Sequence, residues 1–574
     1  MKKRTLTELI IIFTCLITAW WAGKNIAPTT SFSEVRLQHQ INMETGEAFY
    51  LYKDKVTSLK DSVDWTDSPF NPTINQKKNE LPKTQTVKKI TGDQEEYLLF
   101  TSARHFGWFS LLPAFVAILL CFLTREPIVS LLSGAGAGAL LIGQYEFPQF
   151  IVNNLANSSA AKILILYLWL LGGLMGLWSR TGASRAFAEF MTRKFVTGPR
   201  SAKLVAWGLG VVFFQGGTIS SVLVGTSVKP VADKEDISHE ELAYIVDSTS
   251  SPIASQLAFN AWPGYIQAFI FIPGVAFLAT ETDRIQFFFS SVPFCFYAIF
   301  AVLGTFLLSI DKSPFLGKKM KAAIKRAREE KQLDHPDSSP LASITTEVET
   351  QGYKANVLEF FLPLLLLLGT AIGTFISSGS PDILLAFSLA LSLSALMAIA
   401  KGLSIQDTVG AAITGMKSVL SGSVILLIAY VTGQVSKDAG AGFYLVELLG
   451  DSLASASLPI ILFIISIVIA FSTGSSWGTY AVVFPLAMPL AWAVANNTGM
   501  NPDAALFFMT ICFAAVMDGS VFGDQCSPVS DTTVLSSMST GCDLMDHVKT
   551  QLPQACFAAI AACICWTLSV IFFC

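Results

Sequence analysis

The sequence predicts an all-α polytopic membrane protein, and three observations lead to this fold class. Of the 574 residues, 52% are hydrophobic and only 14% are charged, and the mean hydropathy of +0.55 is far above that of soluble domains. Several apolar runs can cross about 30 Å of hydrocarbon as helices, among them 106–123, 163–178, 356–376 and 553–574. Because the runs are continuous and do not alternate like barrel strands, we expect roughly ten to thirteen helical spans.

The chain begins with a candidate signal-anchor helix, residues 1–23. Several basic residues precede an apolar run, a pattern shared by cleaved signal peptides and uncleaved anchors. We expect an anchor, because Trp20 and Trp21 are placed where an interfacial aromatic belt would lie. The polar segment that follows, 24–105, is then expected outside the cytoplasm. Its composition fits a disordered spacer and a small folded domain equally well.

Two clusters of lysine and arginine mark loops on the cytoplasmic side under the positive-inside rule. One extends from Arg180 to Lys203 and the other from Lys312 to Lys331. We therefore expect a first transporter repeat over 106–310, a cytoplasmic basic linker over 311–355 and a second transporter repeat over 356–574.

The composition also argues against several other classes of function. The net charge is −4, and no basic stripe with interleaved aromatic residues suggests a nucleic-acid partner. The ten cysteines form no CxxC pair and the five histidines no HExxH motif, so zinc, redox and metalloprotease chemistry have no sequence support. We expect no enzyme and no cofactor. The expected partners are the lipid bilayer, transported ions and, for the chain itself, a second copy in a homodimer.

A weak internal repeat narrows the mechanism. The segment GLWSRTGASRAFAEF near Gly176 resembles GQVSKDAGAGFYLVE near Gly433, and FFQGGTISS at Phe213 matches FSTGSSWGT at Phe471, a shift of about 257 residues. A duplicated transporter explains both matches. Glycine, serine, threonine and proline at corresponding places predict broken helices or hairpins that line a substrate cavity. The alternative is that these small residues only permit close helix packing.

In the first half, polar residues follow the expected breaks. Gln215 and Thr218 lie in a glycine-rich stretch, Asp247 precedes a Ser-Thr-Ser-Ser-Pro run, and Asn260 follows. Carbonyl and hydroxyl oxygens suit sodium, whereas a helix amino terminus suits an anion, so cation and carboxylate substrates both remain open.

The second half holds the densest group of acids. Asp518, Asp524 and Asp531 lie with Ser527 and Thr532 in an otherwise apolar neighbourhood. Carboxylates in lipid are costly, so they must face a wet cavity or share protons and cations. Competition between a proton and a cation for the same carboxylates is the basis of antiport. The alternative is a polar loop outside the membrane, which the local glycines and proline would also suit.

At these residues the chain resembles the NhaC-type sodium/proton antiporter family. The resemblance is carried by GSVFGDQCSPVSDTTVLSSMSTGCDLMDHVKTQLP from Gly519 to Pro553, and similar segments begin at Leu111, Val224 and Ser472. It covers most of 111–574 and implies two inverted-topology repeats with re-entrant hairpins and broken helices around a central site. Many members carry Asp-Asp-Tyr where this chain has Gln-Gly-Gly at 215–217, which would make it a divergent member. Relatives also include organic-acid exchangers and sodium-coupled amino-acid carriers.

The function expected from the sequence is secondary active sodium/proton antiport across the bacterial inner membrane by alternating access. In this hypothesis Asp524 and Asp531 bind sodium, and together with Asp247 they take up sodium or protons alternately. The runner-up is a sodium-coupled transporter of a small carboxylate or amino acid, with the organic solute bound by Gln215, Thr218, Asn260 and Ser475. A channel, or a sensor that uses the outer segment, is a third hypothesis from a different class.

Overall fold

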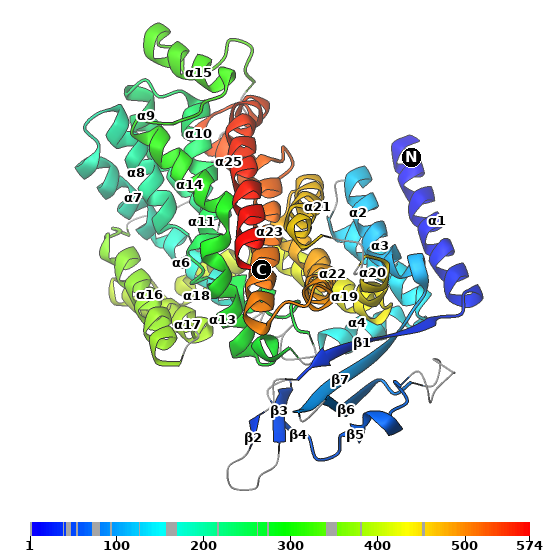
Figure 1. Cartoon of the computed structure of the whole chain (residues 1–574). Helices are drawn as coiled ribbons and strands as arrows, with labels where there is room; N and C mark the ends of the chain where they lie inside the picture. Colours follow the sequence, from blue (N-terminus) through cyan, green and yellow to red (C-terminus); the bar gives the residue numbers. More distant parts are fainter. Residues whose placement is uncertain are drawn as a thin grey trace.

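The computed structural model describes the chain from residue 3 to residue 574 except for 38–39, 42–47, 53–54, 72–80, 92–93, 125–126, 157–168, 215–216, 261, 273–274, 340–352, 379–380, 419 and 450–453. A helical bundle makes up most of it, and a small β domain lies at one end (Figure 1).

The β domain forms from the polar segment after the first helix. β1 (Thr29–Arg36), β7 (Gln94–His105), β6 (Thr84–Thr91) and β5 (Val63–Asp64) make one sheet in that order, and β2 (Gln40–Ile41), β3 (Ala48–Tyr52) and β4 (Lys55–Ser58) make another. The rings of Phe70 and Phe100 stack 4.8 Å apart in its core. Of the two possibilities left open for this segment, its described residues therefore form a folded domain.

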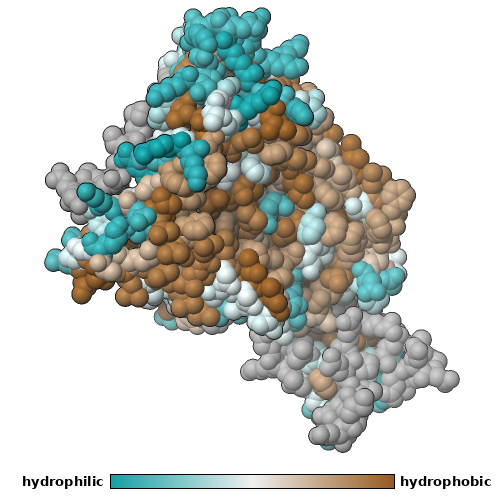
Figure 2. Space-filling view, turned by 90° about the vertical axis from the view of Figure 1, so that its left-hand side faces the viewer, coloured by the Kyte–Doolittle hydropathy of each residue, from teal (hydrophilic) through white to brown (hydrophobic). Residues whose placement is uncertain are grey.

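The helical part is confirmed as a multi-pass membrane bundle. Among the described residues, seven helices are long and apolar enough to cross a membrane, or eight if the bent pair 281–294 and 296–309 counts as one span. Large apolar side chains such as Phe13, Ile376, Leu396 and Ile560 are exposed on its outside, as expected where lipid replaces water. Figure 2 shows the resulting broad hydrophobic band, with hydrophilic residues gathered at its upper end. The larger number of spans expected from the sequence stays a prediction, and the first part of the run 163–178, residues 163–168, lies outside the described residues.

The first part of the chain contains α1 (Lys3–Asn25), α2 (Leu112–Thr124), α3 (Pro127–Leu141), α4 (Phe147–Leu155), α6 (Gly172–Thr181), α7 (Ala183–Phe195), α8 (Pro199–Val212), α9 (Gly217–Lys234), α10 (His239–Ser248), α11 (Ser251–Gln256), α12 (Trp262–Ile266), α13 (Glu281–Ser291) and α14 (Phe296–Ser309). The later part contains α15 (Lys318–Lys325), α16 (Leu358–Ser378), α17 (Ile383–Ala400), α18 (Ile405–Ser418), α19 (Leu420–Asp438), α20 (Ala441–Leu449), α21 (Leu458–Thr473), α22 (Ser476–Asn497), α23 (Pro502–Cys526), α24 (Asp531–Thr540) and α25 (Leu544–Phe573).

Helices and breaks follow one another in the same order in the two halves. Gly182 separates α6 from α7 with φ 70°, and Gly440 separates α19 from α20 with φ 75°, a left-handed conformation that favours glycine. The α8–α9 break then corresponds to the α21–α22 break, and the α10–α11 break to the α23–α24 break. This order supports the duplication expected from the sequence, while the inverted relation of the two repeats stays a prediction.

Small residues also permit close packing, as the alternative interpretation holds. A Cβ atom on Gly519 would lie 2.4 Å from the Phe463 carbonyl oxygen, and one on Gly523 would lie 2.5 Å from the Ala470 Cβ. These glycines let α23 pack tightly against α21. α23 is therefore held in the centre of the bundle, where it carries its carboxylates.

The two basic clusters lie at the same end of the molecule. Arg200 Nε is 2.8 Å from Asp311 Oδ2, and Lys203 Nζ is 2.6 Å from Asp311 Oδ1. That end, with α15, lies opposite the β domain, and the first residues of α1 also point away from the β domain (Figure 1). Lys203 was expected to lie in a loop, and this expectation was wrong. It lies within α8 and is completely buried, because Glu241 and Asp311 neutralise its charge.

Candidate ion-binding site

The Asp524 carboxylate lies near the end of α23 in a cage of serine hydroxyls. Ser530 Oγ donates to Oδ1 at 2.6 Å, and Ser251 Oγ and Ser476 Oγ donate to Oδ2 at 2.9 and 3.2 Å. All four residues are buried. Charge-assisted hydrogen bonds of this kind stabilise a buried carboxylate.

The three serines come from three helix breaks. Ser251 is the first residue of α11, Ser476 is the first residue of α22, and Ser530 immediately precedes α24. The first residues of a helix have unpaired N–H groups and the positive end of the helix dipole, which favour negative charge at Asp524, whereas burial and the nearby Asp531 oppose it. Because Ser251 belongs to the first half and Ser476 to the second, the cage joins the two halves of the helical bundle.

Close approach of the breaks brings the cage together. A Cβ atom on Gly474, at φ 63°, would lie 2.6 Å from the Val529 carbonyl oxygen, and one on Gly217 would lie 3.0 Å from the Thr532 side chain. Glycine at these two positions lets the starts of α9 and α22 contact the segment between α23 and α24.

Asp531 lies beside the cage and is exposed to solvent, although Ser530 and Thr532 on either side of it are buried. Its Oδ1 accepts from the Thr532 N–H at 2.8 Å, and Thr532 Oγ1 is 3.1 Å from Ser530 Oγ. Asp531 and Asp524 are close enough to repel one another electrostatically. Solvent therefore reaches the edge of the Asp524 cage through Asp531.

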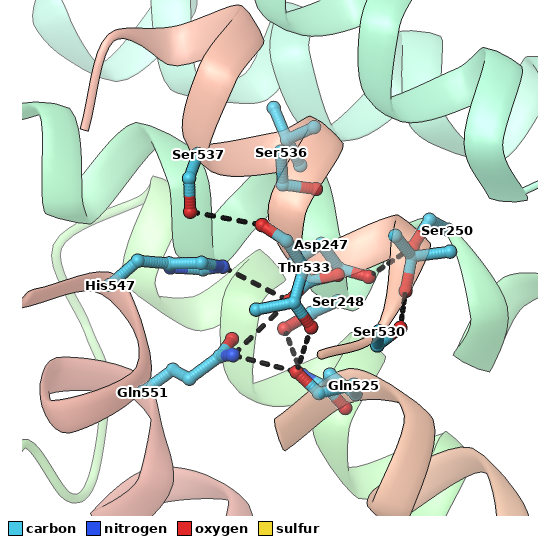
Figure 3. A network of polar contacts seen from close by, with 12 residues as sticks. Asp247, Ser248, Ser250, Gln525, Ser530, Thr533, Ser536, Ser537, His547 and Gln551 are labelled. Atoms are coloured by element: carbon cyan, nitrogen blue, oxygen red, sulfur yellow. Dashed lines mark hydrogen bonds and ion pairs between the residues drawn. The ribbon is translucent and has the colours of Figure 1, made fainter. Parts of the chain in front are cut away.

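Asp247 belongs to a second cluster and not to the hydroxyl cage. Its Oδ2 is 3.0 Å from His547 Nε2 and 3.1 Å from Gln551 Nε2, and all three residues are completely buried. Figure 3 shows the imidazole and the amide converging on this carboxylate. Gln525 joins the two clusters, because it follows Asp524 in the chain and its carbonyl oxygen accepts from Gln551 Nε2 at 2.7 Å.

Other residues expected at the site bond to the backbone of nearby helices. Asp518 accepts from the N–H of Tyr297 at 2.7 Å, at the start of α14. Ser527 Oγ donates to the Phe471 carbonyl at 2.6 Å, near the end of α21. Asn260 Nδ2 donates to the Ala254 carbonyl at 2.7 Å. Ser475 Oγ accepts from the Gly478 N–H at 3.4 Å as the amino-terminal cap of α22. In these contacts the four side chains fix helix ends.

Gln215 and the side chain of Thr218, which were also expected at the site, lie outside the described residues.

The fold brings several residues to the two clusters that were not predicted from the sequence. Ser251 and Ser476 had no distinguishing signal, because the breaks contain many other serines. His547 and Gln551 had a detectable signal, since they lie four residues apart on one face of α25, in its polar first turns before the apolar run. In the described part of the chain, His, Cys, Asp and Glu side chains form no group of three that could hold a metal ion.

Comparison with known proteins places the chain in a family. The model of the "Na+/H+ antiporter family" matches residues 261–569, more than half of the chain. The chain belongs to the Na+/H+ antiporter family. It is therefore a transporter and not an enzyme, and this family member carries Asp524, Asp531 and His547 inside the matched region.

Individual relatives of this family member differ in extent of similarity. An uncharacterized protein of Haemophilus influenzae is 31% identical over 79% of this chain and 89% of its own length. The malate-2H(+)/Na(+)-lactate antiporter of Bacillus subtilis is 27% identical over 30% of this chain and 35% of its own. The arginine/ornithine antiporter of Halobacterium salinarum is 33% identical over 17% of this chain and 18% of its own. The YdaH transporter of Alcanivorax borkumensis has a similar fold, with a TM-score of 0.50, 13% identity and coverage of 80% of this chain and 98% of that one.

Proposed function

We propose that this transporter exchanges sodium for protons across the bacterial inner membrane by alternating access, as a divergent NhaC-type member of its family. The observation that carries the proposal is the Asp524 cage, a buried carboxylate with three hydroxyls and a second, solvent-exposed carboxylate at its edge. Asp524 and Asp531 are the proposed sodium ligands. Sodium is a hard cation that prefers carboxylate and hydroxyl oxygens, which are the groups present here.

The serines can serve two states of the site. When sodium is absent, the hydroxyls of Ser251, Ser476 and Ser530 donate hydrogen bonds to Asp524, as they do in this structure. When sodium enters from the Asp531 side, the same hydroxyls can rotate and direct oxygen lone pairs toward the ion. A relative movement of the two halves would separate Ser251 from Ser476 and open the cage, which couples ion binding to alternating access.

A second candidate function is sodium-coupled transport of a small carboxylate or amino acid. It is favoured by the three helix amino termini around the cage, which suit an organic carboxylate. The Bacillus subtilis relative is a malate-2H(+)/Na(+)-lactate antiporter, and the Halobacterium salinarum relative is an arginine/ornithine antiporter. In this candidate the organic solute would contact Gln215, Thr218, Asn260 and Ser475.

Flux in liposomes separates the two candidates. Purified protein is reconstituted with a pH-sensitive dye inside, and a sodium gradient is imposed inward. Sodium/proton exchange makes the lumen more alkaline, whereas sodium-coupled solute uptake shows no change of lumenal pH until a carboxylate or amino acid is supplied. Asp524→Asn protein serves as the matched control for leak. A wild-type protein that gives no sodium-dependent pH change would contradict the exchange proposal.

A further inference from the structure

Asp247 and His547 form a completely buried acid–base pair outside the Asp524 cage. Asp247 lies near the end of α10 and His547 near the start of α25, with 3.0 Å between Oδ2 and Nε2. Among the described residues, the basic side chain paired with Asp247 is that of His547. Burying a carboxylate is costly unless it is paired and hydrogen-bonded, and here the ring of His547 and the amide of Gln551 are its partners.

Three polar atoms of the cluster are buried and have no hydrogen-bond partner among the residues that the structure describes. They are Asp247 Oδ1, Gln551 Oε1 and His547 Nδ1. The orientation of the Gln551 amide is fixed, because its nitrogen donates both to Asp247 Oδ2 and to the Gln525 carbonyl. The His547 Nε2 is occupied by Asp247, so Nδ1 is the imidazole atom that remains available to take up or lose a proton. Two acceptors and an open imidazole nitrogen in one cluster point to a positively charged ligand.

In the part of the chain that the structure describes, four titratable groups interact electrostatically with Asp247, and none of these four is basic. Tyr297 on α14, Cys526 and Asp524 on α23, and Asp531 on α24 interact with it electrostatically, and Tyr244 lies on α10 itself. Tyrosine and cysteine are neutral in a buried site, and both aspartates are acidic. These acidic neighbours therefore make a positive charge favourable in the Asp247 cluster.

We propose that Asp247 and His547 form a proton-binding site separate from the sodium site, and that Nδ1 of His547 holds the proton that exchanges for sodium. This inference rests on the proposed sodium/proton exchange. With the sodium site empty, the negative charges of Asp524 and Asp531 act on the Asp247 cluster and favour a positive charge there. A sodium ion bound at Asp524 and Asp531 cancels that negative potential, and the proton leaves Nδ1 for water.

The basic linker packs against the start of the helix that carries His547. Ser338 of the basic linker donates to Asp546 Oδ2 at 2.8 Å, and the N–H of Ser339 donates to Asp543 Oδ2 at 3.2 Å. These contacts hold the first turn of α25 at the linker end of the molecule. His547 is the residue after Asp546, so the proton site is within one helical turn of that end.

The test measures protons released when sodium binds. Sodium chloride is added to purified, weakly buffered protein in detergent with a pH dye, and sodium affinity is measured in parallel with ²²Na⁺. We expect His547→Gln to bind sodium within about threefold of wild type and to release less than about a tenth of the protons. In liposomes, His547→Gln should retain ²²Na⁺/Na⁺ exchange and lose sodium/proton exchange. His335→Gln, at an exposed histidine of the linker, is the matched control and should behave as wild type.

Each contrary result has a distinct meaning. Undiminished proton release by His547→Gln would show that sodium and protons compete at Asp524 and Asp531 alone, and would overturn the inference. Loss of both exchange reactions in a well-folded His547→Gln protein would make the pair part of the sodium site and overturn it as well. Asp247→Asn, which removes the counter-charge of the imidazolium, repeats the test if His547→Gln does not fold. Absence of sodium binding by the wild type would instead contradict the proposed function itself.

Discussion

At the scale of single residues, Asp524 shows how a carboxylate can be kept inside a membrane bundle without a lysine or arginine. Its oxygens accept three serine hydroxyls, and helix amino termini surround it. Hydrogen bonds to a charged group contribute about 1.5–3 kcal/mol each. These interactions offset part of the cost of removing the carboxylate from water, and they leave an anionic site that a cation can use.

The first prediction concerns the two proposed sodium ligands. Asp524→Asn and Asp531→Asn keep the size of the side chain but remove its charge, so each should abolish coupled exchange in liposomes while the protein still inserts and purifies normally. Asp518→Asn is a useful comparison, because Asp518 caps α14 and its loss should lower thermal stability more than sodium affinity. An Asp524→Asn or Asp531→Asn protein with wild-type sodium-driven flux would exclude that residue as a ligand.

The second prediction compares two neighbouring serines. Ser476 donates to Asp524, whereas Ser475 caps α22. Ser476→Ala should weaken sodium binding by about 1 kcal/mol, roughly fivefold. Ser475→Ala should instead lower the free energy of unfolding by about 1 kcal/mol, the usual cost of a lost helix cap. Both variants are measured by ²²Na⁺ binding and by thermal unfolding in detergent. Weaker sodium binding in Ser475→Ala together with lower stability in Ser476→Ala would contradict this division of roles.

At the scale of elements, the site depends on helices that end inside the bundle. The α21–α22 break turns at Gly474, where φ is 63° and the Val529 carbonyl is in contact. The α23–α24 break spans Ser527 to Ser530, between the ends of the two helices. In a continuous helix the backbone N–H and C=O groups hydrogen-bond to one another. A break leaves some of these groups unpaired at the point where two half-helices meet, so they are available to an ion.

The third prediction tests the Gly474 turn. Gly474→Ala adds a Cβ atom 2.6 Å from the Val529 carbonyl oxygen and also strains the backbone. Gly499 has a similar φ of 69°, but nothing lies within 4 Å of its Cβ position. Gly499→Ala should therefore cost only about 1 kcal/mol of stability from backbone strain, and Gly474→Ala should cost clearly more and also reduce sodium affinity. Equal losses of thermal stability in the two variants would mean that the contact with Val529 is unimportant.

The fourth prediction concerns pH and the first residue of α10. Burial alone would lower the pKa of His239, but hydrogen bonds to Asp233 and Asp334 outweigh it and raise the pKa from 6.5 to about 9. A raised histidine pKa stabilises the folded protein fully below pH 6.5, and this contribution is lost as pH rises through about 9. His239 lies outside the candidate spans and joins α10 to the linker through Asp334.

Thermal unfolding of wild type and His239→Gln over pH 6 to 10 checks this effect. The wild type should be the more stable protein at pH 6, and the difference should shrink as pH rises past about 9. A difference that does not change with pH would show that His239 contributes by packing and not by its charge.

At the scale of the whole molecule, the basic clusters gather at one end, as the positive-inside rule requires of the cytoplasmic side. The basic linker and the clusters around Asp311 lie at one end, and the β domain lies at the other (Figure 1). Burial alone would raise the pKa of Asp311, but hydrogen bonds from Lys203, Arg328 and Arg200 hold it well below its usual value. Asp311 is therefore charged at physiological pH and ties both basic clusters together.

The fifth prediction is the orientation in the membrane. Single cysteines at exposed positions 197 and 322, placed in a cysteine-free background, should react with a membrane-impermeant maleimide only from the cytoplasmic side. A cysteine at exposed position 61 in the β domain should react only from outside. Labelling of 197 and 322 from opposite sides would contradict both the topology and the contacts of Asp311 with Arg200 and Arg328.

Much of this architecture could be predicted from local features of the sequence. Apolar runs predict spans because hydrocarbon excludes unpaired backbone groups, and the Ser-Pro pairs at 251 and 527 predict breaks because proline cannot continue the hydrogen bonds of a helix. The density of acids at Asp518, Asp524 and Asp531 indicated the candidate site for the same reason, since a charge inside a membrane is costly. These signals act within a few residues and need no knowledge of the fold.

Only the tertiary structure decided which polar groups meet. Ser251 is 273 residues from Asp524 along the chain, and His547 is 300 residues from Asp247, so no local pattern could pair them. The fold placed Asp247 with His547 and not in the hydroxyl cage, and it assigned Asp518 to the start of α14. The physical reason is that the composition of a segment determines whether it enters the membrane, whereas the packing of distant helices determines which side chains compensate a buried charge.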